Sequence, residues 1–163
     1  GTNSFTTVGL ARYVAAVANG GTCYNLTLLD KITDSEGNLI REIEPDVRNV
    51  IEIPQDYWNA LHSGMRQVVQ NKSYFNELSV NVAGKTGTAE QTKSRPNHAL
   101  FVCYAPYEEP EIAMATRIPF GYSSDYAAQV ARDIIKYYYG LEDEEDLITG
   151  VADAPDGGIS NEM

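Results

Sequence analysis

The sequence predicts an α+β fold in which helices pack on an antiparallel sheet of three C-terminal strands. Apolar residues recur every three or four positions in three segments, 7–18, 54–71 and 123–139, as expected for amphipathic helices. Between the last two segments lie three apolar runs of strand character, 78–90, 98–105 and 111–118. Helices and strands that are segregated along the chain in this way are typical of α+β domains.

The first helix is expected to start at a threonine cap, Thr6 or Thr7, and to end at Asn19-Gly20-Gly21, because threonine satisfies free N–H groups and glycine tolerates the left-handed C-terminal turn. Residues 25–32 and 39–44 then flank the polar segment 33–38, which is typical of a hairpin that projects from the body.

Pro54 suits the first turn of the second helix. We expect that helix to end near Asn71 and to bury one face, made of Trp58, Leu61, Met65, Val68 and Val69.

The short connection 106–110 implies that the last two strands pair antiparallel. The final helix should begin around Ser123 or Ser124, end at Gly140 and point six side chains inward: Ala127, Val130, Ala131, Ile134, Ile135 and Tyr138.

The chain has 163 residues, the length of one domain, and a formal net charge of -11. Residues 141–163 hold eight acidic and no basic residues, which leaves 15 acidic against 12 basic residues in 1–140. We therefore divide the chain into a body, 1–140, and an acidic, disordered tail, 141–163. A near-neutral body without a basic patch argues against nucleic acid as the main partner. The distant Cys23 and Cys103 form no metal-binding pair, so no metal is expected. We expect Cys103 to be a small apolar side chain among the apolar residues of its strand, and a single disulfide to Cys23 is the alternative.

The segment Val82–Glu90 carries the most informative motif, Lys85-Thr86-Gly87. A phosphate-binding loop would need a glycine at position 79, which is Ser79, and a helix after the motif instead of a strand. The other interpretation is the Lys-Thr-Gly element of penicillin-recognising serine enzymes. An exposed strand lysine beside a glycine bulge is the structural alternative.

The wider sequence resembles the C-terminal part of the transpeptidase domain of class B penicillin-binding proteins, the elongation-type peptidoglycan D,D-transpeptidases. The resemblance spans about Asn3 to Gly140 and rests on six segments: Phe5–Val14, Ala18–Gly21, Met65–Val69, Val82–Ala89, Phe101–Pro106 and Ala128–Ala131. The chain departs from the family at Cys103, often glycine there, and at Gly9, where glutamine is common. No Ser-x-x-Lys occurs in it, and Ser79-Val80-Asn81 lies too close to the motif to be the family's Ser-x-Asn.

The resemblance implies a part of an active site without cofactor. Lys85 would position charge and handle protons beside a serine that precedes Gly1, and the hydroxyls of Thr86 and Thr88 would bind the substrate's terminal carboxylate. The backbone N–H of Thr88 would form half of an oxyanion hole, and Gly87 would let substrate lie along the strand. The ligands that the resemblance implies for this active site are D-Ala-D-Ala stem peptides and β-lactams.

The implied partners are the remainder of the transpeptidase domain and, in the cell, cell-wall elongation proteins. The parent would act at the extracytoplasmic face of a bacterial membrane, held by an anchor outside this chain, and the chain alone would be inactive. Two alternatives stay open: a fragment of a D-alanyl carboxypeptidase or β-lactam sensor, and a non-catalytic peptide-binding module. His62 and His98 lack a serine or cysteine at triad spacing, so both are expected to be structural.

Overall fold

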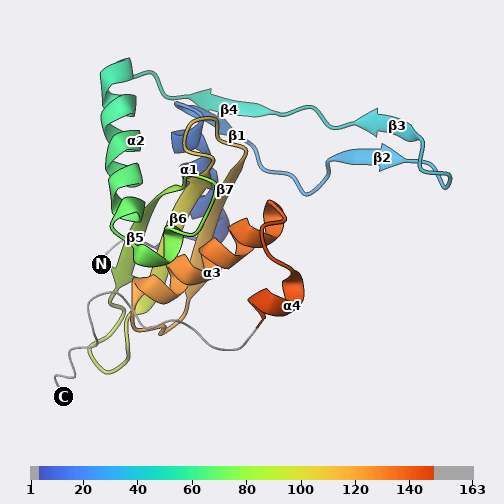
Figure 1. Ribbon diagram of the computed structural model, residues 1–163. Coiled ribbons are helices and arrows are strands. Elements are labelled where there is room, and N and C mark those ends of the chain that lie inside the picture. Colours follow the sequence, from blue (N-terminus) through green and yellow to red (C-terminus); the bar gives the residue numbers. More distant parts are fainter. Residues whose placement is uncertain (1–3, 149–163) are drawn as a thin grey trace.

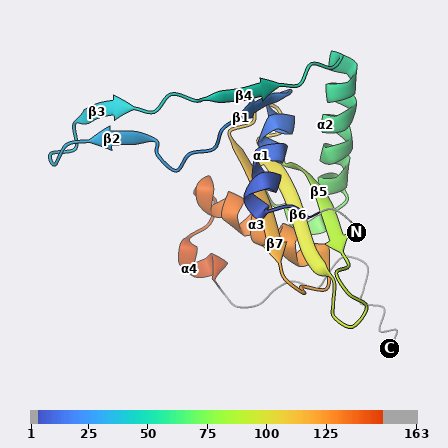
Figure 2. The ribbon, with the colours of Figure 1, turned by 180° about the vertical axis from the view of Figure 1, so that it is seen from behind.

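A three-stranded antiparallel sheet forms the centre of the computed structural model, which describes residues 4–148. Its order is β5-β6-β7, with bounds Ala83–Ala89, His98–Ala105 and Ile112–Ile118. Helix α1 (Thr7–Ala18) covers one face, α3 (Ser124–Tyr138) covers the other, and α2 (Gln55–Gln70) stands beside β5 (Figures 1 and 2). The predicted α+β fold is confirmed, including the meander of three strands and the helix packed on it.

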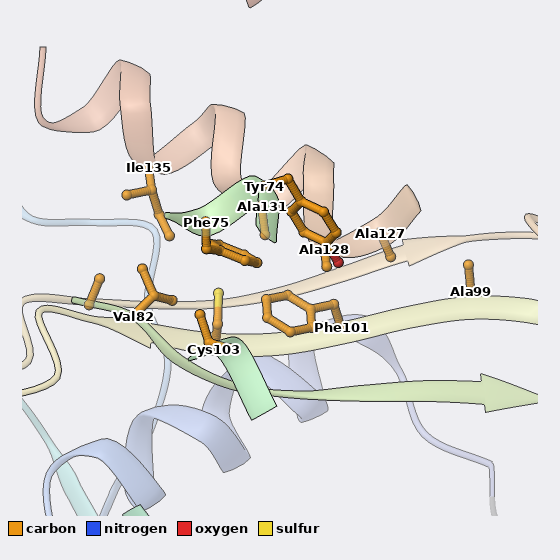
Figure 3. Close-up of a cluster of buried hydrophobic side chains, with 12 residues drawn as sticks. Tyr74, Phe75, Val82, Ala99, Phe101, Cys103, Ala127, Ala128, Ala131 and Ile135 are labelled. Atoms are coloured by element: carbon orange, nitrogen blue, oxygen red, sulfur yellow. The ribbon is translucent and has the colours of Figure 1, made fainter. Parts of the chain in front are cut away.

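Two apolar cores lie on the two faces of this sheet. The larger core joins β6 to α3 and to the 3₁₀ helix η1 (Ser73–Phe75). Figure 3 shows Phe101 and Cys103 of the sheet facing Phe75 and the α3 side chains. The smaller core joins Val14 and Val17 of α1 to Ala83 and Tyr104 of the sheet, together with Met65 of α2. Alternation along each strand therefore assigns odd-numbered β5 residues to the α1 face and even-numbered ones to the α3 face.

Helix α3 buries a narrower face than its sequence predicts. Its buried apolar side chains are Ala127, Ala128, Ala131 and Ile135. Three residues predicted to point inward are exposed instead: Val130 (41%), Ile134 (42%) and Tyr138 (54%). The small alanine side chains let α3 lie close to β6, so that only these four apolar positions contact the sheet. The neighbouring apolar residues on the helix surface remain exposed to solvent. On α2, similarly, the predicted inward residue Leu61 is 38% exposed.

The predicted hairpin is a longer ribbon with two paired segments. Strands β2 (Lys31–Thr33) and β3 (Leu39–Glu42) pair at its tip, and β1 (Thr22–Tyr24) pairs with β4 (Val47–Val50) at its base. It projects from the body, as expected (Figure 1). The expectation of a strand over residues 25–30 is wrong, because this stretch links the two paired segments of the ribbon and, within residues 4–148, no strand lies opposite it. Strand β4 is not predicted, because its exposed Val-Arg-Asn-Val presents no apolar face.

The first strand of the sheet is shorter than the apolar run that predicts it. The strand begins at Ala83 instead of Leu78, because Leu78 and Val80 pack against the larger core without pairing to a strand. An apolar run signals burial, and burial does not require a strand. At the other end of the chain, residues 144–147 form a short helix, α4, within the segment predicted as a tail, and residues 149–163 lie outside the described residues.

Candidate functional site

The Lys-Thr-Gly motif lies in the middle of β5, the edge strand of the described sheet. In residues 4–148, β5 pairs with β6 and with no other strand, so its second edge carries backbone N–H and C=O groups without a strand partner. Lys85 and Thr88 are exposed on this strand. An edge of this kind can accept an extended peptide as an added strand.

The strand divides the predicted site residues between its two faces. Lys85 pairs with Val102 and Gly87 with Leu100, on the face that α1 covers. Thr86 pairs with Phe101 and Thr88 with Ala99, on the α3 face. A ligand that lies along the free edge of β5 would therefore have the lysine ammonium on one side and the threonine hydroxyls on the other.

A cleft of about 590 Å³ opens beside this strand, between the start of α1 and the sheet. Its lining includes Lys85, Thr86 and Gly87, but Thr88 is not part of it. The apolar part of its lining includes Leu10 of α1 together with Leu100 and Val102 of β6. The structure thus brings three of the four predicted site residues to one cleft.

The ammonium of Lys85 is available to a ligand. Its Nζ donates a hydrogen bond to the carbonyl oxygen of Thr86 at 2.8 Å. In the described part of the chain, no carboxylate pairs with it. The cleft contains a second cation, Arg117 of β7, and one acid, Glu90. Sequence reasoning missed Arg117, since only the pairing of Leu100 with Arg117 brings it to the same face as Gly87.

The two glycines of β5 differ in what surrounds them. A Cβ atom on Gly84 would lie 2.5 Å from Cζ of Phe101 and 2.8 Å from the carbonyl oxygen of Val102. At Gly87, a Cβ would meet only Leu100, at an ordinary contact distance of 3.5 Å. Packing within the chain therefore requires glycine at position 84 but not at position 87.

The remaining candidate groups have structural partners. His62 contacts the carbonyl oxygen of Val17 through Nε2, at 2.7 Å. Cys23 and Cys103 are both free, and burial raises the pKa of the Cys103 thiol to about 12, which makes that thiol a poor nucleophile. Asn81 of the Ser-x-Asn match accepts a hydrogen bond from Arg66 and donates one to Glu108, and it does not line the cleft.

The fold matches solved penicillin-binding transpeptidase domains. Penicillin-binding protein 2B of Streptococcus pneumoniae (strain R6) superposes with a TM-score of 0.74 at 30% identity, over 85% of this chain and 25% of that chain. Penicillin-binding protein A of M. tuberculosis, solved as an imipenem acyl-enzyme complex, superposes with a TM-score of 0.72 at 25% identity, over 85% of this chain and 32% of that one. The fold therefore defines this chain as part of a transpeptidase domain.

The family follows from the sequence match. Residues 1–136 match the model of the penicillin-binding protein transpeptidase domain, and the chain belongs to that family. Among relatives, penicillin-binding protein 2B of S. pneumoniae serotype 2 is 31% identical over 153 residues, and peptidoglycan D,D-transpeptidase MrdA of Haemophilus influenzae is 31% identical over 101 residues, or 50% of this chain and 16% of the relative. The predicted resemblance to class B penicillin-binding proteins is confirmed.

The match covers a minor part of each relative. The chain aligns over 83% of its own length with penicillin-binding protein 2B and spans 22% of that protein. Its homologues are penicillin-binding D,D-transpeptidases, and the chain is a partial transpeptidase domain. In the described residues, no helix has the length and apolar character that crossing a membrane requires.

Proposed function

We propose that β5 forms one wall of the active site of a serine-type D,D-transpeptidase, in a parent protein that cross-links peptidoglycan stem peptides. One observation carries the proposal: the Lys-Thr-Gly segment lies on an edge strand that borders a cleft and presents an ammonium without a carboxylate partner in residues 4–148. Family membership and β-lactam acyl-enzyme structures of relatives support it.

The reaction would be an acyl transfer in two steps. A serine outside this chain attacks the carbonyl of the penultimate D-alanine, so that a serine ester forms, the peptide C–N bond breaks and terminal D-alanine leaves with the proton on its amine. An amine of a neighbouring stem peptide then attacks the ester, forms the new amide and releases the serine. The parent would do this at the extracytoplasmic face of the membrane, with cell-wall elongation proteins as its partners.

Each residue of the motif has a role in this scheme. Lys85 supplies positive charge beside the serine and assists proton movement. Thr86, with the hydroxyl of Thr88, binds the terminal carboxylate of the peptide, while the backbone N–H of Thr88 stabilises the oxyanion. A single donor of this kind contributes about 3–4 kcal/mol in acyl transfer. Gly87 keeps the strand edge clear for the peptide.

Acylation of the full-length parent by a labelled penicillin tests this assignment. Lys85→Ala should abolish acylation without unfolding the protein, because the side chain is exposed and contributes little burial. Thr86→Val should be milder, since it removes one hydrogen bond to a charged group, about 1.5–3 kcal/mol, and keeps a β-branched residue. Thr88→Ala should also be milder than Lys85→Ala, because the backbone N–H remains.

The free edge of β5 also favours a second candidate, a module that binds peptide as an added strand and performs no reaction. That module would bind peptide but form no covalent adduct with penicillin. Acylation of Lys85→Ala at the wild-type rate would overturn the active-site assignment of β5, whereas the absence of any penicillin adduct in the wild-type parent would favour the module. A carboxypeptidase or a β-lactam sensor would also be acylated by penicillin. Only the transpeptidase would transfer the acyl group to an amine, which is measured as the formation of cross-linked dimers from stem peptides.

A further inference from the structure

His98, the first residue of β6, has both ring nitrogens in hydrogen bonds. Its Nδ1 accepts from the backbone N–H of Phe120 at 3.1 Å, and its Nε2 lies 3.1 Å from Oε1 of Gln91. A nitrogen that accepts from an N–H carries no proton, so the other nitrogen donates to Gln91, and the two bonds agree on one neutral tautomer. Neither nitrogen is left to take a proton from a substrate, although the residue lines the cleft and is only 9% exposed.

The group that His98 holds on one side is the turn between β7 and α3. Phe120 and Tyr122 both have positive φ angles, 56° and 61°, although neither is glycine. Such a backbone conformation is strained and persists only where surrounding contacts hold it. The His98 ring supplies one of these contacts, since it accepts the Phe120 N–H and lies 4.7 Å from the Phe120 ring, centroid to centroid.

On its other side, His98 holds the loop that follows the motif strand. Residues 90–97 connect β5 to β6, and three contacts tie them to the same turn or to His98. Gln91 bonds to His98, the guanidinium of Arg95 lies 5.3 Å from the centroid of the Phe120 ring, and the carbonyl oxygen of Asn97 accepts from the N–H of Tyr122 at 3.2 Å. The loop is thus attached to a strained, preformed turn.

The end of β5 depends on this attachment. Ala89, its last residue, pairs with His98, and Thr88 precedes it on an edge strand that has one strand neighbour in the described sheet. We infer that His98 is a positioning residue for acyl transfer: it fixes the carboxyl end of β5, where Gly87 and Thr88 meet the substrate, to the turn that precedes α3. This inference rests on the proposed function, because it concerns the placement of that function's oxyanion donor.

Kinetics of penicillin acylation in the full-length parent test the inference, with the noncovalent dissociation constant and the acylation rate constant measured separately. A donor displaced by about 1 Å can slow a reaction about a hundredfold. We therefore expect His98→Ala to lower the acylation rate constant about 10- to 100-fold and to change the dissociation constant little. His98→Asn, whose Oδ1 can still accept from the Phe120 N–H, should recover most of the rate.

His62→Ala is the matched control, because His62 also bonds a backbone group and packs on aromatic rings but does not line the cleft. It should lower the melting temperature and leave the acylation rate constant unchanged. Amide hydrogen exchange over residues 86–97 should accelerate in His98→Ala and not in His62→Ala. Equal slowing of acylation by the two alanine variants, or a wild-type rate in His98→Ala, would overturn the inference.

Two further variants keep the test decisive. Should His98→Ala not fold, Gln91→Ala replaces it, because Gln91 is an exposed loop residue whose loss does not disturb a core. It should slow acylation several-fold and accelerate exchange in the loop, and wild-type behaviour in both would contradict the inference. Lys85→Ala separates the two proposals: a wild-type rate there would reject the proposed function itself, whereas loss of acylation there with no effect at His98 would reject only the positioning role.

Discussion

The two glycines of β5 allow one substitution, glycine to alanine, to separate stability from catalysis. In Gly84→Ala, the new Cβ would lie 2.5 Å from Cζ of Phe101 and 2.8 Å from the carbonyl oxygen of Val102. Phe101 is 1% exposed and its ring packs against Phe75 at 5.9 Å, so it has little room to withdraw. Overpacking of a core costs about 1–3 kcal/mol, and we expect the upper end because a backbone atom must also move.

Gly87→Ala should behave in the opposite way. Its Cβ would make an ordinary contact of 3.5 Å with Leu100, so the fold accepts it. Alanine also restricts the unfolded chain, which stabilises a compatible site by about 0.4–1 kcal/mol. If a peptide lies along this edge during the proposed reaction, the same methyl group obstructs it. Acylation by penicillin should then slow at least about tenfold, because the ligand can no longer approach the strand closely.

Thermal unfolding and penicillin acylation of the full-length parent measure both effects. One kcal/mol shifts the melting temperature by about 2–4 °C in a domain of 150–250 residues and by less in a larger one, so Gly84→Ala should melt a few degrees below the wild type and Gly87→Ala at or slightly above it. Acylation at the wild-type rate in Gly87→Ala would refute the reasoning that glycine is needed there for an external ligand. A melting temperature of Gly84→Ala equal to the wild type would refute the packing argument.

Three other predictions concern the buried polar groups and the chain itself. Asp125→Ala should lower the free energy of unfolding by about 3–5 kcal/mol in urea titrations, because its buried carboxylate accepts from Nζ of Lys72 at 2.6 Å and from the hydroxyl of Tyr74 at 2.9 Å. Glu77→Ala, at a carboxylate that is 53% exposed, should lose less than about 1 kcal/mol, and equal losses would contradict the burial argument. Burial raises the pKa of the Cys103 thiol from 9.0 to about 12, so the unfolded state loses this proton at a lower pH than the folded state. The free energy of unfolding should therefore be unaffected below about pH 9 and should fall between about pH 9 and pH 12. An unchanged dependence of this free energy on pH in Cys103→Ala would disprove that origin. Mass spectrometry of this chain alone with a β-lactam should detect no adduct, since it contains no Ser-x-x-Lys, and a stoichiometric adduct would place the nucleophile within it.

Local patterns were sufficient to predict most secondary structure. The cap at Thr6 is observed, with its Oγ1 accepting from the N–H of Gly9 at 3.0 Å, and the three strands pair in the predicted antiparallel order. These features depend on neighbours in the sequence or on short connections, so periodicity and turn residues report them directly. The wrong predictions concern two situations. At Leu78 a residue is packed against the core without belonging to a strand, and at Ile134 a helix has more apolar residues on its surface than the sheet can cover.

The sequence by itself determined that Lys85, Thr86, Gly87 and Thr88 occupy one strand. Their segment is a short run of strand character, and two further runs of the same kind follow it, as in a sheet of three consecutive strands. Only the tertiary structure decided that this strand is an edge, that Lys85 and the threonines point to opposite faces, and that Arg117 joins the cleft. It also decided that His98 links the motif strand to the turn before α3. Such relations join residues far apart in the chain, and their distances follow from strand register and helix packing, which no local pattern encodes.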